Sequence, residues 1–226
     1  MENTKRTFIA FDGLDGSGKE TQTKLLLKYF EAENKGYRYL SFPTYDESWS
    51  KHVTMYLNGD FGSDPEAVNA YAASSFFASD RYCSYMLDWK KDYESGKIIL
   101  SNRYTTANCV HQLSKLPEDE WDAFLEWLYD YEFTKLGLPR PDLCIYLCIP
   151  PEVAKANIIS RSAANADRHM DIHEKSVDHL EKSYRAALYS ASKLGWKTVN
   201  CAENDVMRPI DDIHNEIVSI IREWEK

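Results

Sequence analysis

The sequence has no long apolar run, and no stretch approaches the ~20 residues that a membrane-spanning helix needs. Its polar start, Met1 to Arg6, also lacks the apolar core of a secretory signal peptide. Positive charge is scarce, because 27 lysines and arginines stand against 36 acidic residues and give a net charge of −9. Binding of a nucleic-acid polymer needs a clustered basic surface. We therefore predict a soluble, cytoplasmic protein without a membrane or nucleic-acid partner.

Cysteine pairs at short spacing are also missing. The five cysteines form no C-x-x-C motif and no spacing typical of metal ligands. We expect them to be reduced and mostly buried. The chain carries no internal repeat, and its 226 residues, 43% of them hydrophobic, suffice for one complete core. The prediction is a single domain over residues 1–226.

Short β-rich runs alternate with longer helical stretches, which is typical of α/β proteins. The predicted strands are 7–11, 37–42, 98–101, 143–149 and 197–200. The predicted helices are 65–93, 118–134, 151–160, 173–194 and 209–224. The run 143–149 is almost entirely apolar, as expected of a parallel strand that is buried on both faces. We predict a five-stranded parallel sheet flanked by helices, with ligands at the carboxyl ends of the strands.

The segment 8–19 places an apolar strand, a glycine-rich turn and a lysine in the order that a phosphate-binding loop requires. Gly13, Gly16 and Gly18 allow the backbone to approach an anion closely, and the helix that begins near Lys19 directs its positive dipole end at the same anion. The segment therefore predicts binding of a nucleoside triphosphate. We expect its phosphates to contact Gly13, Asp15, Gly16, Ser17, Gly18, Lys19, Glu20 and Thr21.

Polar and aromatic residues follow the second and third predicted strands, in the segments 42–45 and 102–108. In the helix between those strands, Phe77 and Arg81 are four residues apart and share one face. A ring and a guanidinium so placed can stack on a base and donate to its carbonyl or to a phosphate. Taken alone, the pair is better explained by ordinary structure, with Phe77 as a core residue and Arg81 in a surface ion pair.

Several separated motifs together resemble those of the thymidylate kinase family, over essentially the whole chain. The phosphate loop with its acid Asp15 resembles the family pattern, and so do the segments 42–45, 77–81 and 102–104. Farther on, the spacing from Asp167-Arg168 to Tyr184 is similar to that of the family's lid and the helix after it. The resemblance implies a P-loop nucleoside-kinase fold with a short lid, at about 161–172.

The resemblance also implies roles for single residues. Asp15 would accept a hydrogen bond from the 3′-hydroxyl of a deoxyribose, and Phe77 would stack on thymine. Arg81 would donate to the thymine carbonyl, and Asn108 would approach the base edge. Arg103 would hold the acceptor phosphate.

Three further residues complete the expected substrate site. Tyr45 belongs to the motif after the second strand, and Gln112 lies where family members have polar base or sugar contacts. His111 falls where members carry a tyrosine near the 2′ carbon, although a histidine on a helix surface is the alternative.

Gly16 occupies the place where some family members carry a catalytic arginine, so the lid must supply that charge. The candidates there are Arg161 and Arg168, in a small, polar segment typical of a mobile flap. The predicted catalytic residues are thus Lys19, Arg103, Arg161 and Arg168.

Departures from the family pattern concern the expected Mg²⁺. Glu20 replaces the usual Ser or Thr, Asn102 replaces an Asp, and Cys148 stands where an acid is often found. One hypothesis is that Glu20 supplies the carboxylate that Asn102 lacks, with Asp12 as a nearby acid. Thr21 is rotated about 100° around the helix and is a poor substitute. The opposite hypothesis is a weakly active relative.

We predict ATP-dependent phosphorylation of dTMP to dTDP. The alternatives are a kinase for another nucleotide or deoxynucleoside, and a weakly active nucleotide-binding regulator. The resemblance further implies a homodimer, with Tyr71, Phe76 and the 121–127 region as apolar contributors, although core packing explains those residues equally well.

Overall fold

The computed structural model describes residues 6–62, 64–164 and 177–226. Its centre is a parallel sheet in the order β2-β3-β1-β4-β5, in which every neighbouring pair runs parallel. The strands are β1 (Thr7–Gly13), β2 (Tyr37–Ser41), β3 (Ile98–Asn102), β4 (Leu143–Cys148) and β5 (Lys197–Asn200). Each lies within two residues of its predicted bounds. The expected five-stranded α/β architecture is therefore confirmed.

Helices account for most of the remaining described chain. They are α1 (Lys19–Ala32), α2 (Lys51–Asn58), α3 (Ala70–Ser84), α4 (Lys90–Glu94), α5 (Thr105–His111), α6 (Trp121–Tyr129), α7 (Pro151–Ala164), α8 (Val177–Leu194) and α9 (Ile210–Trp224). Two π-helical segments continue α3 and α6, namely η3 (Tyr85–Trp89) and η6 (Asp130–Lys135). The 3₁₀ turns are η1 (Ser48–Ser50), η2 (Pro65–Ala67), η4 (Leu113–Lys115) and η5 (Glu118–Glu120), and β6 (Ala202–Glu203) pairs with β7 (Val206–Met207).

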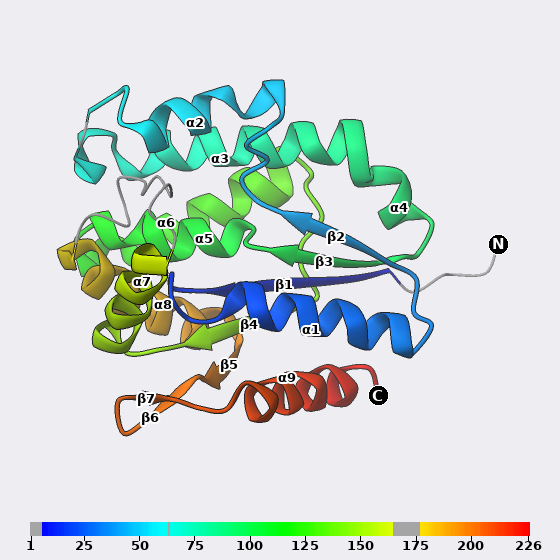
Figure 1. Ribbon diagram of the computed structural model, residues 1–226. Coiled ribbons are helices and arrows are strands. Elements are labelled where there is room, and N and C mark those ends of the chain that lie inside the picture. Colours follow the sequence, from blue (N-terminus) through cyan, green and yellow to red (C-terminus); the bar gives the residue numbers. More distant parts are fainter. Residues whose placement is uncertain (1–5, 63, 165–176) are drawn as a thin grey trace.

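Different helices cover the two faces of the sheet (Figure 1). Ile9 and Phe11 of β1 share a core with side chains of α1 and α9, which lie side by side. Phe8 and Ala10 alternate with them and pack toward the opposite face, together with Trp89. Every residue of β1 is buried, because this strand lies in the middle of the sheet with helices on both sides.

Differences from the predicted elements concern short helices. The expected helix 65–93 is observed as α3, η3 and α4 in succession, whereas α2 and α5 were not predicted. Both are eight residues or fewer, too short for a clear helical period in the sequence. No helix in the described part of the chain is long and apolar enough to cross a membrane.

Candidate active site

Two adjoining pockets lie at the carboxyl ends of the strands. The first, which we call the aromatic pocket, is lined by Asp15, Phe42, Pro43, Tyr45, Leu57, Phe77, Arg81, Arg103, Tyr104, Ala107, Asn108, His111 and Gln112. The second, the phosphate-loop pocket, is lined by Asp15, Gly16, Gly18, Lys19, Glu20, Thr21, Lys24, Tyr39, Ser41, Asn102 and Arg103. Asp15 and Arg103 line both pockets, so the two cavities meet at this pair.

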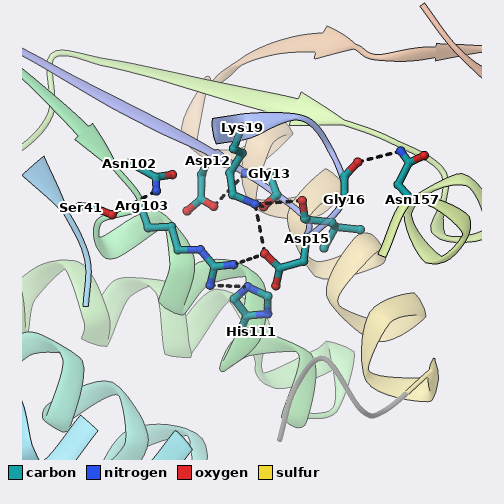
Figure 2. A network of polar contacts seen from close by, with 11 residues as sticks. Asp12, Gly13, Asp15, Gly16, Lys19, Ser41, Asn102, Arg103, His111 and Asn157 are labelled. Carbon is teal, nitrogen blue, oxygen red and sulfur yellow. Dashed lines mark hydrogen bonds and ion pairs between the residues drawn. The ribbon is translucent and has the colours of Figure 1, made fainter. Parts of the chain in front are cut away.

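The phosphate loop joins β1 to α1 in a conformation that depends on glycine. Gly16 and Gly18 have φ values of 86° and 87°, in the left-handed region that favours glycine. A Cβ at Gly16 would lie 2.5 Å from the carbonyl oxygen of Ala154 in α7. On the same side, Asn157 Nδ2 donates to the Gly16 carbonyl at 2.9 Å (Figure 2). The loop is thus packed against α7 too closely for any side chain at position 16.

Lys19 is turned toward its own loop. Its ammonium donates to the carbonyls of Gly13 at 2.5 Å and Leu14 at 2.9 Å, and it lies 3.5 Å from Asp15 (Figure 2). Burial lowers the pKa of Lys19, although the carboxylate of Asp15 acts in the opposite direction. Neutral carbonyls compensate a buried cation only weakly, so an incoming phosphate is a better partner than those present.

Arg103 follows β3 and pairs with Asp15. Its Nη2 lies 2.7 Å from Asp15 Oδ1, and its Nη1 lies 3.5 Å from His111 Nε2 (Figure 2). Burial alone would raise the pKa of Asp15, but Arg103 and Lys19 outweigh it and hold that pKa far below its usual value. Arg103 has a φ of 62°, which is uncommon for a residue with a Cβ and concentrates at functional sites.

Arg81 is held inside the wall of the aromatic pocket by an ion pair. Its Nε and Nη2 donate to Glu132 of η6 at 2.7 and 2.5 Å, and the two side chains are 1% and 0% exposed. Burial acts to lower the pKa of Arg81, but the adjacent carboxylate raises it above its ordinary value. The sequence suggested Arg81 as a ligand contact and gave no partner for it.

The segment that follows β2 is anchored by Asp80, which precedes Arg81 on α3. Its carboxylate accepts hydrogen bonds from the backbone N–H and the hydroxyl of Thr44. Thr44 in turn accepts a hydrogen bond from Trp49 Nε1 at 3.0 Å. These contacts hold the segment after β2, so that Pro43 and Tyr45 line the pocket.

Residues proposed for a metal are spread around the phosphate-loop pocket. Glu20 lies 2.6 Å from Lys24, and Asn102 Nδ2 donates to Ser41 at 3.2 Å. Asn102 Oδ1 is buried and accepts no hydrogen bond from the described residues. Asp12 already accepts from the Gly13 N–H and from the Thr106 hydroxyl. No group of three His, Cys, Asp or Glu side chains able to hold a metal occurs in the described segments.

Most of the predicted site residues are brought together by the fold. Tyr45, Phe77, Arg81, Asn108, His111 and Gln112 line the aromatic pocket, as expected of a substrate site. Gly13 and Ser17 are buried and do not line the phosphate-loop pocket. Cys148 is buried in the core beside the Tyr184 hydroxyl, 3.9 Å away. Arg168 and the side chain of Arg161 lie outside the described residues.

Glu132 is the principal residue that the sequence analysis missed. It lies eleven residues after Trp121, on the helix face that also carries Leu125 and Leu128, both buried. A carboxylate on an apolar helical stripe was therefore a usable signal, because a buried charge requires a partner. The pattern does not identify that partner, which is 51 residues away in the chain.

The parallel sheet carries a glycine-rich phosphate loop after its first strand, and a second pocket suited to a base adjoins that loop. This arrangement defines a P-loop kinase of nucleoside monophosphates. The family model described as thymidylate kinase matches residues 11–217. The chain belongs to the thymidylate kinase family, and the predicted family and enzyme class are confirmed.

Relatives from distant organisms match most of the chain. The thymidylate kinase of Mycobacterium tuberculosis is 27% identical over 191 residues, covering 83% of this chain and 86% of the relative. That of Plasmodium falciparum is 28% identical over 217 residues, with coverage of 96% and 90%. The probable thymidylate kinase of Thermococcus gammatolerans is 29% identical over 222 residues, with 96% coverage of both chains.

A solved structure is similar in fold. Thymidylate kinase from Candida albicans superimposes with a TM-score of 0.69 at 18% identity, and the match covers 97% of this chain and 92% of that one. The likeness supports the same architecture and topology.

Proposed function

We propose that this chain transfers the γ-phosphate of ATP to dTMP and forms dTDP and ADP. One observation carries the proposal: Asp15 and Arg103 line both pockets, so ligands in the two pockets meet at this pair. Family membership supports the same two substrates.

In this proposal the aromatic pocket holds the acceptor nucleotide. Phe77 stacks on the thymine ring, and Arg81 donates to a thymine carbonyl. Asp15 accepts from the 3′-hydroxyl, and His111, 3.5 Å from Arg103, crowds the 2′ position. Arg103 binds the acceptor phosphate, because its guanidinium lies at the junction of the pockets.

Transfer of the phosphoryl group then needs positioning and charge neutralisation more than proton chemistry. A phosphate monoester has a second pKa of about 6, so the acceptor oxygen is already ionised at neutral pH. Lys19 and Arg103 reduce the repulsion between the two polyanions. The residues around the phosphate loop also fit the Mg²⁺ that we propose as cofactor, since Asn102 Oδ1 is a buried oxygen without a hydrogen-bond donor.

Asn102 and Glu20 would hold that ion from the protein side, with waters and phosphate oxygens completing its ligands. Bound Mg²⁺ would supply further neutralisation of phosphate charge. We keep the weakly active regulator as the second candidate, because Asn102 and Cys148 stand where acids are expected and Asp12 already accepts hydrogen bonds from the Gly13 N–H and the Thr106 hydroxyl.

The phosphate loop cannot supply a catalytic arginine, because a side chain at Gly16 would collide with the Ala154 carbonyl. We propose that Arg161 or Arg168, in a lid at about 161–172, supplies this charge. Arg168→Ala or Arg161→Ala should lower kcat about 10³-fold and barely change the dissociation constant for dTMP. Single-turnover kinetics with equilibrium dTMP binding would measure both. Wild-type kcat in both single variants and in the double variant would contradict the proposal.

A coupled assay of ADP release with MgATP tests the function directly. We expect turnover with dTMP to exceed turnover with dUMP, dCMP, dGMP and UMP. A higher kcat/KM for another nucleotide would favour a kinase of different specificity. If the protein binds nucleotides tightly but releases no ADP with any of the five monophosphates, the weakly active regulator is favoured.

We further propose one kinase domain over residues 1–226, a cytoplasmic location and a homodimer. The apolar residues first considered for the dimer take part in internal packing, since Tyr71 contacts Phe124 and Trp127 at ring-centroid distances of 5.3 and 4.7 Å. Exposed Met86 and Leu87 of η3 are better placed for contact with a second copy. Light scattering during size-exclusion chromatography would determine the oligomeric state.

A further inference from the structure

Glu132 is a buried carboxylate that lies behind the wall of the aromatic pocket. It is 0% exposed and does not line the pocket itself. Besides the two hydrogen bonds from Arg81, it accepts one from the Thr105 hydroxyl at 2.6 Å and one from Asn108 Nδ2 at 3.2 Å. Two of these three donors, Arg81 and Asn108, line the pocket. Glu132 can therefore act on a ligand through them.

The carboxamide of Asn108 can present either an acceptor or a donor to the pocket, and its surroundings decide between the two. Its Nδ2 faces Glu132 Oε1 at 3.2 Å and the carbonyl oxygen of Ser74 at 3.4 Å. Both are acceptors only, so the reversed amide would place oxygen against oxygen. Oδ1 accepts no hydrogen bond from the described residues and is left for the pocket.

Arg81 presents the opposite polarity. Of its five N–H groups, two are directed at Glu132 and one at the Tyr104 carbonyl, 3.3 Å away. The remaining N–H groups, on Nη1 and Nη2, are available to a ligand in the pocket. The wall thus offers a donor from Arg81 next to an acceptor from Asn108.

A donor beside an acceptor matches the C4 carbonyl and N3–H of a thymine or uracil ring. Cytosine has the reverse arrangement, with an amino group at C4 and a bare nitrogen at position 3. We propose that Glu132 is a positioning residue that sets this hydrogen-bond polarity, and that it makes the pocket select a 4-oxo pyrimidine over a 4-amino pyrimidine. The proposal rests on the proposed function, because it assumes that the aromatic pocket binds the nucleotide base.

Glu132→Gln tests the proposal. A glutamine side chain carries a donor where Glu132 has only acceptors, so Asn108 can turn over, accept from Gln Nε2 and present Nδ2 to the pocket. Only the longer contact with the Ser74 carbonyl, at 3.4 Å, then opposes the turned amide. The substrates to compare are dTMP and 5-methyl-dCMP, which differ only at C4 and N3. We expect the ratio of kcat/KM for dTMP to that for 5-methyl-dCMP to fall at least tenfold.

Asp80→Asn is the matched control. Asp80 is also a buried carboxylate that does not line the pocket itself, yet its hydrogen bonds go to Thr44 and not to Asn108. Its loss should raise KM for both nucleotides and leave their ratio within about threefold of the wild type. A purely structural role of Glu132 predicts the same behaviour for Glu132→Gln.

Because Glu132→Gln leaves Arg81 without a counter-charge, the variant can fail to fold. The second variant is then Asn108→Leu, which keeps the Arg81–Glu132 ion pair and removes the acceptor that Glu132 is proposed to orient. It should also lower the dTMP preference at least tenfold relative to the wild type.

An unchanged ratio in either comparison overturns the role of Glu132. The wild-type protein separates this outcome from a failure of the proposed function. If the wild type does not phosphorylate dTMP, the proposed function is wrong before any variant is measured. If it prefers dTMP and the ratio is insensitive to residue 132, only the inference about Glu132 is wrong.

Discussion

The aromatic pocket and the phosphate-loop pocket meet at Asp15 and Arg103, yet their charges are organised in opposite ways. In the aromatic pocket, Arg81 is completely buried and paired with the equally buried Glu132. In the phosphate-loop pocket, Lys19 donates mainly to neutral backbone carbonyls.

The difference separates recognition from catalysis. The groups that face the acceptor base belong to the core of the protein, so their geometry is set when the chain folds. At the proposed phosphate site, the carbonyl partners of Lys19 are easily exchanged for a ligand, whereas Arg103 at the junction keeps its ion pair with Asp15. Loss of a charge should therefore destabilise the fold at the first pocket and reduce turnover at the second.

Arg81→Ala should have the largest effect and would test the first half of this comparison. Removing one member of a buried ion pair costs about 3–5 kcal/mol, because Glu132 is left uncompensated. We expect the free energy of unfolding in denaturant to fall by that amount. In the protein that remains folded, KM for dTMP should rise much more than KM for ATP. Equal changes in both KM values would place Arg81 outside the acceptor site.

Lys19→Ala should show the opposite pattern. In the proposed mechanism its ammonium neutralises phosphate charge in the transition state, and the loss of one such group lowers kcat about 10²–10³-fold. The thermal midpoint should stay close to that of the wild type, since Lys19 gives up two neutral carbonyls and a 3.5 Å contact with Asp15, which keeps its closer ion pair with Arg103. Calorimetry and steady-state kinetics on the same sample would check both. Near-normal kcat in a folded variant would contradict the assignment of the phosphate loop.

Lys115 carries a partly buried charge that opposes folding. Its ammonium donates to the Tyr56 hydroxyl at 2.7 Å and the Val68 carbonyl at 3.1 Å, and burial lowers its pKa to about 8. The ordinary lysine pKa, which applies to the unfolded chain, is about 10.4. Between pH 8 and that value the unfolded chain binds more protons than the folded protein, so the free energy of unfolding rises with pH. We expect an increase of about 1–2 kcal/mol from pH 8 to pH 9.5.

Denaturant unfolding across that pH range measures the rise. Lys115→Met should abolish it, whereas Lys97→Met, at an exposed lysine paired with Asp92, should preserve it. A rise that persists in Lys115→Met would mean that another group titrates.

The smallest expected effect concerns Glu20 and Asn102, which line the phosphate-loop pocket together. If Glu20 supplies the acid that Asn102 lacks, Glu20→Thr alone should weaken Mg²⁺-dependent turnover, and adding Asn102→Asp should restore it. Residues that share one site are coupled by more than ~0.5 kcal/mol in a double-mutant cycle. Strict additivity of the two changes in kcat/KM would favour the weakly active regulator.

Local patterns in the chain were enough to predict the sheet and the phosphate loop, whereas most of the pocket residues were predicted only from the resemblance to the family. Phe77 and Arg81 were placed on one helix face by their spacing, and both line the aromatic pocket. The short helices α2 and α5 were not predicted, because they are too short to show an amphipathic period in the sequence and are stabilised by tertiary contacts. The role of Glu132 was not predicted either, although it lies on the same helix face as the buried Leu125 and Leu128, which indicated that it is buried.

The sequence by itself determined where the backbone can approach a phosphate and which segments are strands, since these depend on glycine, on apolar runs and on near neighbours. Only the tertiary structure decided the partners of the buried charges. Arg81 and Glu132 are 51 residues apart, and Arg103 and Asp15 are 88 apart. Such pairings are set by how the helices and strands pack, because a buried charge is stable only beside a partner that packing brings within hydrogen-bond distance.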